Sequence, residues 1–357
     1  MPPSQRPRVI TVLSTSRSDF GHLLAITAAI HQDQQLELQL AIIAGADSIK
    51  EHHARIKRAL SDGFATVVTT KVLSDAKPDF VLFLGDRYEL LELVSTLVRR
   101  NIILAHIHGG ELTLGAFDNQ VRYALSALSH LHFVAHEDYA TNLIERGEEP
   151  WRIFVTGAPA LDVIEPCPRS TKLAPTYILA IFHPVTLEAG QETAQVHELQ
   201  AALGVFDLPV IVIGPNPDPA ADVVDQAWRR WASDRVRVSY TNAVAPQHFW
   251  NLMAGASVMV GNSSAGLIEA ASFGLPVVNV GTRQQGRFCP PNVINTVCTA
   301  TEIQEAIRQA LEPAFQDKVR DLPNPLWCGG AAKRIVEVLK TVELGDRLLR
   351  KKFVAAG

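Results

Sequence analysis

Acidic and histidine side chains that follow apolar runs are the first candidates for proton transfer. Asp86 occurs in Leu84-Gly-Asp-Arg-Tyr-Glu89, directly after the apolar run Phe80–Leu84. Charged residues at the carboxyl end of a buried strand face the ligand crevice of an open α/β sheet. We therefore favour a role for Asp86 at a ligand over the alternative that it only caps the following helix.

A second stretch, His106-Ile-His-Gly-Gly-Glu, continues to Asp118 and contains His108 and Glu111. With Asp86, the carboxylates of Glu111 and Asp118 could converge on one ligand, where carboxyl groups of separated pKa supply a general acid and base. His106 and His108 would share one face of a strand. A metal bound by this histidine pair is the less favoured alternative, so no metal site is predicted, and His106 is expected to be a hydrogen-bonded core residue.

The stretch Gly261-Asn-Ser-Ser-Ala-Gly-Leu-Ile-Glu-Ala270 indicates an anion site. Ser263 and Ser264 would begin a helix, where backbone N–H groups and the helix dipole favour a diphosphate. Gly266 would allow close approach of the ligand to the backbone. Glu269, further along the same helix, could accept hydrogen bonds from ribose hydroxyls. The alternative is an ordinary serine cap with a glycine needed for packing.

Further polar groups follow other apolar runs. Arg283, in Gly281-Thr-Arg-Gln-Gln-Gly-Arg287, could pair with phosphate oxygens. His183, after another apolar run, could protonate or hydrogen-bond a leaving phosphate. Arg17, in the stretch after the first run, could reach a nucleotide. That stretch lacks the G-x-G-x-x-G fingerprint, so a dinucleotide cofactor is not supported.

The elements that must position these residues alternate along the chain. Short apolar runs at Val9–Leu13, Leu38–Ile43, Phe80–Leu84, Ile102–Ile107 and Leu131–Val134 predict buried parallel strands, and Tyr177–Phe182, Val210–Ile213, Val236–Ser239, Val258–Val260 and Val277–Val280 predict a second set. Helical patterns such as Arg87–Arg100 separate them. The fold class is therefore α/β, with two doubly wound Rossmann-like domains and a ligand cleft between them.

Three prolines in Glu165–Pro175 indicate a linker. We place the first domain, which carries the carboxylates, at residues 1–168 and the second, which binds the nucleotide, at 169–357. Ala331–Lys352 is predicted to form one long helix that could pack back on the first domain.

Composition narrows the function classes. The chain has 357 residues, 47% of them hydrophobic and 20% charged, with a formal net charge of -4. This balance argues against nucleic-acid or membrane partners. The four cysteines show no C-x-x-C spacing, which favours reduced thiols in the cytoplasm.

The motifs together resemble the hydrolysing UDP-N-acetylglucosamine 2-epimerases of sialic-acid and related nonulosonic-acid biosynthesis. They occur in family order between about residues 11 and 290: T-S-R-S-D-F-G, L-G-D-R-Y-E, H-I-H-G-G-E-L-T-L-G-A-F-D-N-Q-V-R, F-V-T-G-A-P-A-L-D, F-H-P-V-T-L-E, G-N-S-S-A-G-L-I-E-A and G-T-R-Q-Q-G-R. Each motif alone is weak, but the ordered set is specific.

The resemblance implies a GT-B-like fold and assigns roles to residues. Asp86 falls on a family catalytic aspartate, and Asp118 on the aspartate of a D-x-x-x-R segment. Some relatives carry Glu where this chain has His108, which leaves Glu111 as the nearest carboxylate and a role for either residue open. The positions that the family uses for the nucleotide correspond to Arg17, Arg87, His183, Asn216, Ser263, Ser264, Glu269 and Arg283.

The implied reaction is elimination of UDP from C1 and C2, followed by hydration to a free manno-configured sugar, without a cofactor and in a homo-oligomer (dimer or tetramer). The identity of the substrate, UDP-GlcNAc or the nucleotide of a diacetamido trideoxy sugar, stays open. Whether the nucleotide is UDP or GDP also stays open. A non-hydrolysing 2-epimerase is the alternative reading. A glycosyltransferase and a UDP-sugar-binding regulator without catalysis are more distant ones.

Overall fold

The structure, a computed structural model, describes residues 6–15, 17–42, 66–68, 77–164, 177–216, 218–242 and 244–354. The chain divides into two compact units. Unit 1 comprises Met1–Glu111, Asp118–Val163 and Leu326–Gly357, and unit 2 comprises Leu112–Phe117 and Ile164–Pro325. The segment Leu112–Phe117 therefore belongs to unit 2, although the residues on both sides of it belong to unit 1.

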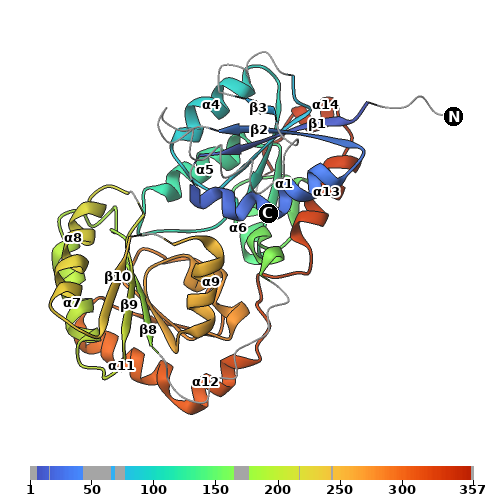
Figure 1. Cartoon of the computed structure of the whole chain (residues 1–357). Helices are drawn as coiled ribbons and strands as arrows, with labels where there is room; N and C mark the ends of the chain where they lie inside the picture. The colour runs from blue at the N-terminus through green and yellow to red at the C-terminus, as the bar shows by residue number, and fades with distance from the viewer. Residues whose placement is uncertain are drawn as a thin grey trace. The chain divides into compact units, whose positions relative to one another are not determined.

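Unit 1 contains a seven-stranded sheet in the order β3-β2-β1-β4-β5-β6-β7, in which all neighbouring strands are parallel. Figure 1 labels β1, β2 and β3 of this sheet. Its strands are β1 (Arg8–Ser14), β2 (Leu36–Ile42), β3 (Thr66–Val68), β4 (Phe80–Leu84), β5 (Ile103–Ile107), β6 (Leu131–Val134) and β7 (Ile153–Val155). The strand order reverses between β1 and β4, where Ile10 lies opposite Phe80. Such a switch point is where doubly wound sheets bind ligands, at the carboxyl ends of the strands.

The helices of unit 1 each bury part of their surface. They are α1 (Arg17–Gln32), α4 (Glu89–Val98), α5 (Asp118–Leu128), α6 (Glu137–Glu145), α13 (Ala331–Thr341) and α14 (Asp346–Leu349), with short 3₁₀ helices η1 (Pro150–Arg152) and η2 (Pro159–Val163). Helix α4 lies within the predicted helical stretch Arg87–Arg100, and its buried side chains are Leu90, Val94 and Leu97.

The single helix predicted for Ala331–Lys352 is wrong. Helix α13 ends at Thr341 because Val342 adopts an extended conformation (φ -60°, ψ 132°), and the chain becomes helical again only at Asp346 after an extended Gly345. The apolar face of α13 lies in the hydrophobic core of unit 1, through Ile335, Val336 and Leu339 among others.

Unit 2 contains a six-stranded parallel sheet in the order β10-β9-β8-β11-β12-β13. Its strands are β8 (Ile178–Ile181), β9 (Val210–Ile213), β10 (Val238–Thr241), β11 (Val258–Gly261), β12 (Val277–Val280) and β13 (Val293–Thr296). The sequence placed β10 two residues too early and missed β13, whose residues are only half-buried.

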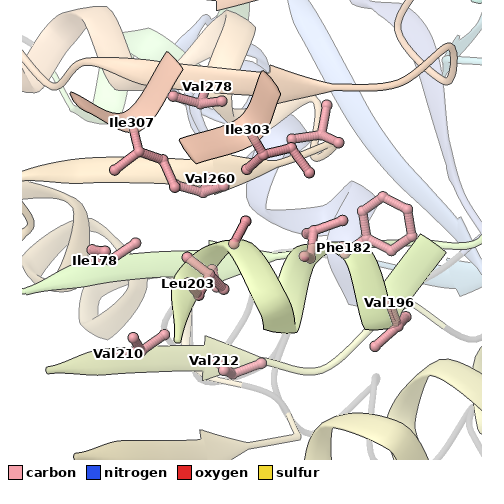
Figure 2. Close-up of a cluster of buried hydrophobic side chains, with 14 of the residues drawn as sticks. Ile178, Phe182, Val196, Leu203, Val210, Val212, Val260, Val278, Ile303 and Ile307 are labelled. Atoms are coloured by element: carbon pink, nitrogen blue, oxygen red, sulfur yellow. The ribbon is translucent and has the colours of Figure 1, made fainter. Parts of the chain in front are cut away.

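Helices cover the sheet of unit 2: α7 (Glu192–Leu203), α8 (Ala221–Ser233), α9 (Pro246–Gly255), α10 (Ala265–Ile268), α11 (Ala300–Leu311) and α12 (Pro313–Arg320), with η3 (Ala270–Phe273) after α10. Figure 2 shows the core that results, in which Val196 and Leu203 of α7 join Ile303 and Ile307 of α11 over strand residues such as Val260. Burying each such side chain contributes about 1.5–3 kcal/mol.

Two doubly wound parallel sheets confirm the predicted α/β fold class. The proline-containing stretch Glu165–Pro175 lies outside the described residues. No helix among the residues that the structure describes is long and apolar enough to cross a membrane.

Candidate active site

Asp86 lies beyond the carboxyl end of β4, one residue after Gly85, whose φ of 83° turns the chain out of the strand. It does not cap α4, because that helix begins at Glu89 with Tyr88 as its N-cap residue. Instead its carboxylate forms a short ion pair with the guanidinium of Arg122. The structure thus contradicts the capping alternative and pairs Asp86 with a buried cation.

Arg122 also contacts the backbone of Glu111, the second predicted acidic residue. Its Nη1 donates a hydrogen bond to the backbone carbonyl of Glu111 over 2.9 Å, and the residue is only 1% exposed. A guanidinium offers several donors in a rigid plane, so it can hold two groups at fixed relative positions. Arg122 therefore links the turn that carries Glu111 to the loop that carries Asp86.

His108 and Glu111 contact each other directly. Nδ1 of His108 lies 2.5 Å from Oε1 of Glu111, and both side chains are almost completely buried. Strand β5 ends at Ile107 and His108 has a φ of 63°, so the expectation that His106 and His108 share one strand face is wrong. The sequence offered these two residues as alternatives, and the structure places them in one pair.

His106 is a hydrogen-bonded core histidine, as predicted. Its Nε2 lies 2.7 Å from the carbonyl oxygen of Gly85 and its Nδ1 lies 3.0 Å from the hydroxyl of Ser126. Burial lowers the pKa of His106 to about 3, so the ring is neutral at physiological pH. A neutral ring that donates from Nε2 to the Gly85 carbonyl supports the turn on which Asp86 lies.

The remaining candidates of unit 1 lie at helix starts. Asp118 is the first residue of α5, four residues before Arg122, and this spacing puts both side chains on one side of the helix. Arg87 is half-buried beside Glu89, with Nη2 3.4 Å from Oε1. Arg17 begins α1 just beyond β1, and its side chain lies outside the described residues.

In unit 2, His183 follows β8 and is held at both its backbone and its ring. Its N–H donates to Oδ1 of Asn262 over 2.7 Å, and its Nδ1 accepts from the N–H of Asn216 over 3.1 Å. Burial, and then the charge of Arg283, hold the pKa of His183 well below its usual range. A neutral ring with Nδ1 as acceptor carries its hydrogen on Nε2, where it can donate to a ligand.

Asn262, directly after β11, forms hydrogen bonds with the loop after β8 and with the loop after β12. Its side-chain amide donates to the carbonyl of His183 over 2.8 Å. Its own carbonyl accepts from Nη1 of Arg283 over 3.2 Å and from Nε2 of Gln284 over 2.8 Å. Arg283 also lies 3.8 Å from the carboxylate of Asp218. These contacts position the guanidinium of Arg283 close to the backbone after β11 and lower the freedom of its side chain.

The predicted anion loop differs from expectation in two respects. Ser264 is the N-cap residue of α10, as predicted, and Oγ of Ser263 accepts from the N–H of Ala265 over 3.4 Å. However, α10 spans only Ala265–Ile268, so its dipole is small. A Cβ at Gly266 would lie 2.9 Å from Val277, so this glycine permits packing of α10 on β12. Gly266 therefore has the packing role that the sequence allowed as the alternative to close approach of a ligand.

The sequence placed Glu269 inside the helix. In the structure it follows the helix as its C-cap residue. Its side chain is buried, and Nε1 of Trp250 lies 3.4 Å from its Oε1. Burial raises the pKa of Glu269 to about 7. This carboxyl is therefore poised between its neutral and ionised forms near physiological pH.

The residues Leu112–Phe117, which directly follow His106-Ile-His-Gly-Gly-Glu111 in the chain, belong to unit 2. The N–H of Leu114 donates to the carbonyl of Gln285 over 2.9 Å, and the N–H of Phe117 donates to the hydroxyl of Thr186 over 3.1 Å. A Cβ at Gly115 would lie 2.4 Å from the carbonyl oxygen of Thr282. The segment thus lies against the loops that follow β8 and β12, which carry His183 and Arg283.

Sequence reasoning missed two residues that organise the site. Arg122 was visible only as the end of the D-x-x-x-R segment, and Asn262 only as the polar residue after an apolar run. Both are fully buried. A buried polar side chain must have hydrogen-bond partners, and these partners come from distant parts of the chain that a sequence does not show to be neighbours.

Comparison with known proteins identifies the family of the chain. A family model described as UDP-N-acetylglucosamine 2-epimerase matches residues 17–340. The chain is 32% identical to UDP-N,N'-diacetylbacillosamine 2-epimerase (hydrolyzing) of Legionella pneumophila, in an alignment that covers 96% of this chain and 98% of the relative. It is 28% identical to GDP/UDP-N,N'-diacetylbacillosamine 2-epimerase (hydrolyzing) of Campylobacter jejuni, in an alignment that covers 97% of this chain and 99% of the relative. The crystal structure of UDP-GlcNAc 2-epimerase from Neisseria meningitidis bound to UDP-GlcNAc has the same fold, with a TM-score of 0.76 and 19% identity over 93% of this chain and 99% of that one. The predicted resemblance is confirmed, and the chain belongs to the UDP-N-acetylglucosamine 2-epimerase family.

Proposed function

We propose that the protein is a hydrolysing 2-epimerase, which converts a UDP-linked 2-acetamido sugar and water to the free manno-configured sugar and UDP. The observation that carries the proposal is the linked set of proton-transfer groups in unit 1. Arg122 holds the carboxylate of Asp86 and the backbone of Glu111, and Glu111 in turn pairs with His108. Two relatives that match nearly the whole chain are named as hydrolysing enzymes, which supports hydrolysis over simple epimerisation.

Unit 2 supplies the nucleotide site in this proposal. Nε2–H of His183 and the guanidinium of Arg283 are donors for phosphate oxygens, and charge-assisted bonds to phosphate contribute more than neutral ones. Glu269, buried beside Trp250, accepts from ribose hydroxyls. The assignment is supported by the way Asn262 holds the first two groups close to each other.

The proposed chemistry has two halves. In the first, a base removes the C2 proton, the C2–H electron pair forms the C1=C2 double bond, and the C1–O pair leaves with UDP. The C2 proton is not next to a carbonyl group, so departure of UDP must run ahead of proton removal and needs cationic groups at the diphosphate. In the second half, water adds its hydroxyl to C1 and gives its other proton to a base, while an acid delivers a proton to the opposite face of C2.

The substrate that we favour is a UDP-linked 2,4-diacetamido-2,4,6-trideoxy sugar, because the two named hydrolysing relatives act on diacetylbacillosamine nucleotides. The product would then serve synthesis of a nonulosonic acid. Few and scattered cysteines support a reducing compartment, the cytoplasm, as the place of the reaction.

A panel of UDP- and GDP-sugars, incubated in D₂O and followed by NMR, tests the proposal. We expect free UDP together with a free manno-configured sugar that carries deuterium at C2. Asp86→Asn should lower turnover on the order of 10²- to 10⁴-fold, the scale of a lost general acid or base, while UDP affinity is retained. Asp138→Asn, an exposed carboxylate of the same unit, is the matched control.

Two results would contradict the proposal. An epimerised UDP-sugar without free sugar would identify a non-hydrolysing 2-epimerase. A product without deuterium at C2, or a fully active Asp86→Asn enzyme, would exclude the proton-transfer steps given above.

A further inference from the structure

The backbone of His108 is held in a conformation that residues other than glycine rarely adopt, with a φ of 63°. Such strain persists only where the surroundings enforce it, and it concentrates at functional sites. Here the N–H of His108 donates to the carbonyl of Phe133 over 3.0 Å, and the amide of Asn142 donates to the carbonyl of Gly110 over 2.9 Å. Gly110 itself has a φ of 76° and lies so close to Tyr139 that a Cβ would come within 2.2 Å of its carbonyl oxygen.

In this turn, Nδ1 of the His108 ring faces Glu111, and Nε2 is left for another partner. Nδ1 is 2.5 Å from the carboxylate, a distance typical of a strong, charge-assisted hydrogen bond. Nε2 has no hydrogen bond within the part of the chain that the structure describes. When Nδ1–H donates to Glu111, Nε2 carries the lone pair and is the basic atom of the pair.

Glu111 is the inner member of the pair. Its side chain is 2% exposed against 8% for His108, and its backbone carbonyl accepts from Arg122. A carboxylate held in this way can orient the imidazole and balance the charge that the ring gains when it takes a proton.

We infer that His108 is the residue that removes the C2 proton and that Glu111 is a positioning residue that acts through it; this division of roles rests on the proposed function. Nε2 takes the proton from C2, the C2–H pair becomes the C1=C2 bond, and the C1–O pair departs with UDP. The imidazolium, paired with Glu111, then returns its proton to water. Hydration of the double bond takes its C2 proton from a different group, on the other face.

A double-mutant cycle tests whether the two residues act as one unit. Asparagine tolerates positive φ, so His108→Asn removes the base without new backbone strain. We expect His108→Asn to lower kcat on the order of 10²- to 10⁴-fold and Glu111→Gln to lower it less. The double variant should be no slower than His108→Asn alone, since groups that act as a unit are not additive.

Two further measurements separate catalysis from folding. His108→Gly fits the same backbone conformation, so added imidazole should restore part of its turnover but none of that of Glu111→Gln. In enzyme with ¹⁵N-labelled histidine, a far-downfield proton bonded to Nδ1 of His108 should be present in the wild type and absent in Glu111→Gln, whether or not a substrate is known. Calorimetric UDP binding reports that each variant is folded.

The inference is overturned if the losses of the two single variants multiply, or if Glu111→Gln is inactive while His108→Asn turns over normally. It is also overturned if imidazole fails to restore a folded His108→Gly enzyme. Wild-type enzyme that releases no UDP from any sugar in the panel would instead reject the proposed function, and the Nδ1 resonance would still test the pair.

Discussion

At the residue scale, Glu269 is a carboxyl whose charge should control nucleotide binding. Burial raises its pKa to about 7, and its partner Trp250 donates only one hydrogen bond. The ionised carboxylate accepts hydrogen bonds from ribose hydroxyls better than the neutral acid does. His183, the histidine assigned to the nucleotide, is neutral because burial holds its pKa well below its usual range.

We therefore expect affinity for a UDP-sugar to rise by about tenfold between pH 6 and pH 8, as one proton leaves Glu269. Titration calorimetry in the Asp86→Asn background measures binding without turnover, and the diester of the sugar nucleotide does not titrate in this range. Glu269→Gln is the control and should bind with an affinity that does not depend on pH. An equal pH dependence in that variant would assign the titration to another group.

The places of individual candidate residues were predictable where a polar side chain follows an apolar strand. Asp86 and His183 lie just beyond the ends of β4 and β8, as the sequence predicted, whereas Glu269 was expected inside a helix and instead follows it. What could not be predicted is which groups meet. The pairing of Asp86 with Arg122 joins residues 36 positions apart, and only the folded sheet brings β4 and α5 together.

At the element scale, helix α13 is capped by a residue from elsewhere in the chain. Asp162 of η2 accepts hydrogen bonds from the N–H groups of Ala331 over 2.9 Å and Ala332 over 2.7 Å. Gly330, at the N-cap position itself, has no side chain that could do this. A carboxylate at a helix start also interacts favourably with the helix dipole.

Asp162→Ala should lower the free energy of unfolding by about 1–2 kcal/mol, the usual scale for loss of an N-cap. Denaturant unfolding followed by circular dichroism measures the change. Asp346→Ala is the matched control, because that aspartate lies at the start of α14 but is 77% exposed. A loss of stability as large in the control would show that the cap at α13 is not special.

Element boundaries followed from the sequence only where periodicity and packing agreed. The apolar stripe of Ala331–Thr341 predicted a helix correctly, but basic residues beyond it suggested a continuation to Lys352. Side-chain hydrogen bonds to distant parts of the chain decide otherwise. Lys351 donates to the carbonyl of Ala127 and to Glu148, and Arg152 donates to the carbonyl of Leu348. These tertiary bonds hold the chain out of a straight helix and override its propensity.

At the scale of the whole molecule, the alternation of strands and helices predicted two doubly wound sheets. It did not predict that Leu112–Phe117 belongs to unit 2, because a glycine-containing stretch of only six residues is too short to show a periodicity that assigns it to a sheet. Glu111 and Asp118, the residues that flank this segment, belong to unit 1. Two acidic residues predicted at the site are thus joined along the chain by backbone that packs on the loops after β8 and β12.

The return of the chain to unit 1 has a consequence for folding during synthesis. Ala332, Ile335, Val336 and Leu339 are part of the core of the first sheet, yet they are translated after all of unit 2. Domains usually fold in the order in which they emerge. Here the core of unit 1 stays incomplete while unit 2 can already form, so a released fragment that ends at Pro325 should resist protease only within unit 2. Protection of β1–β7 at that length would show that α13 is dispensable for early folding.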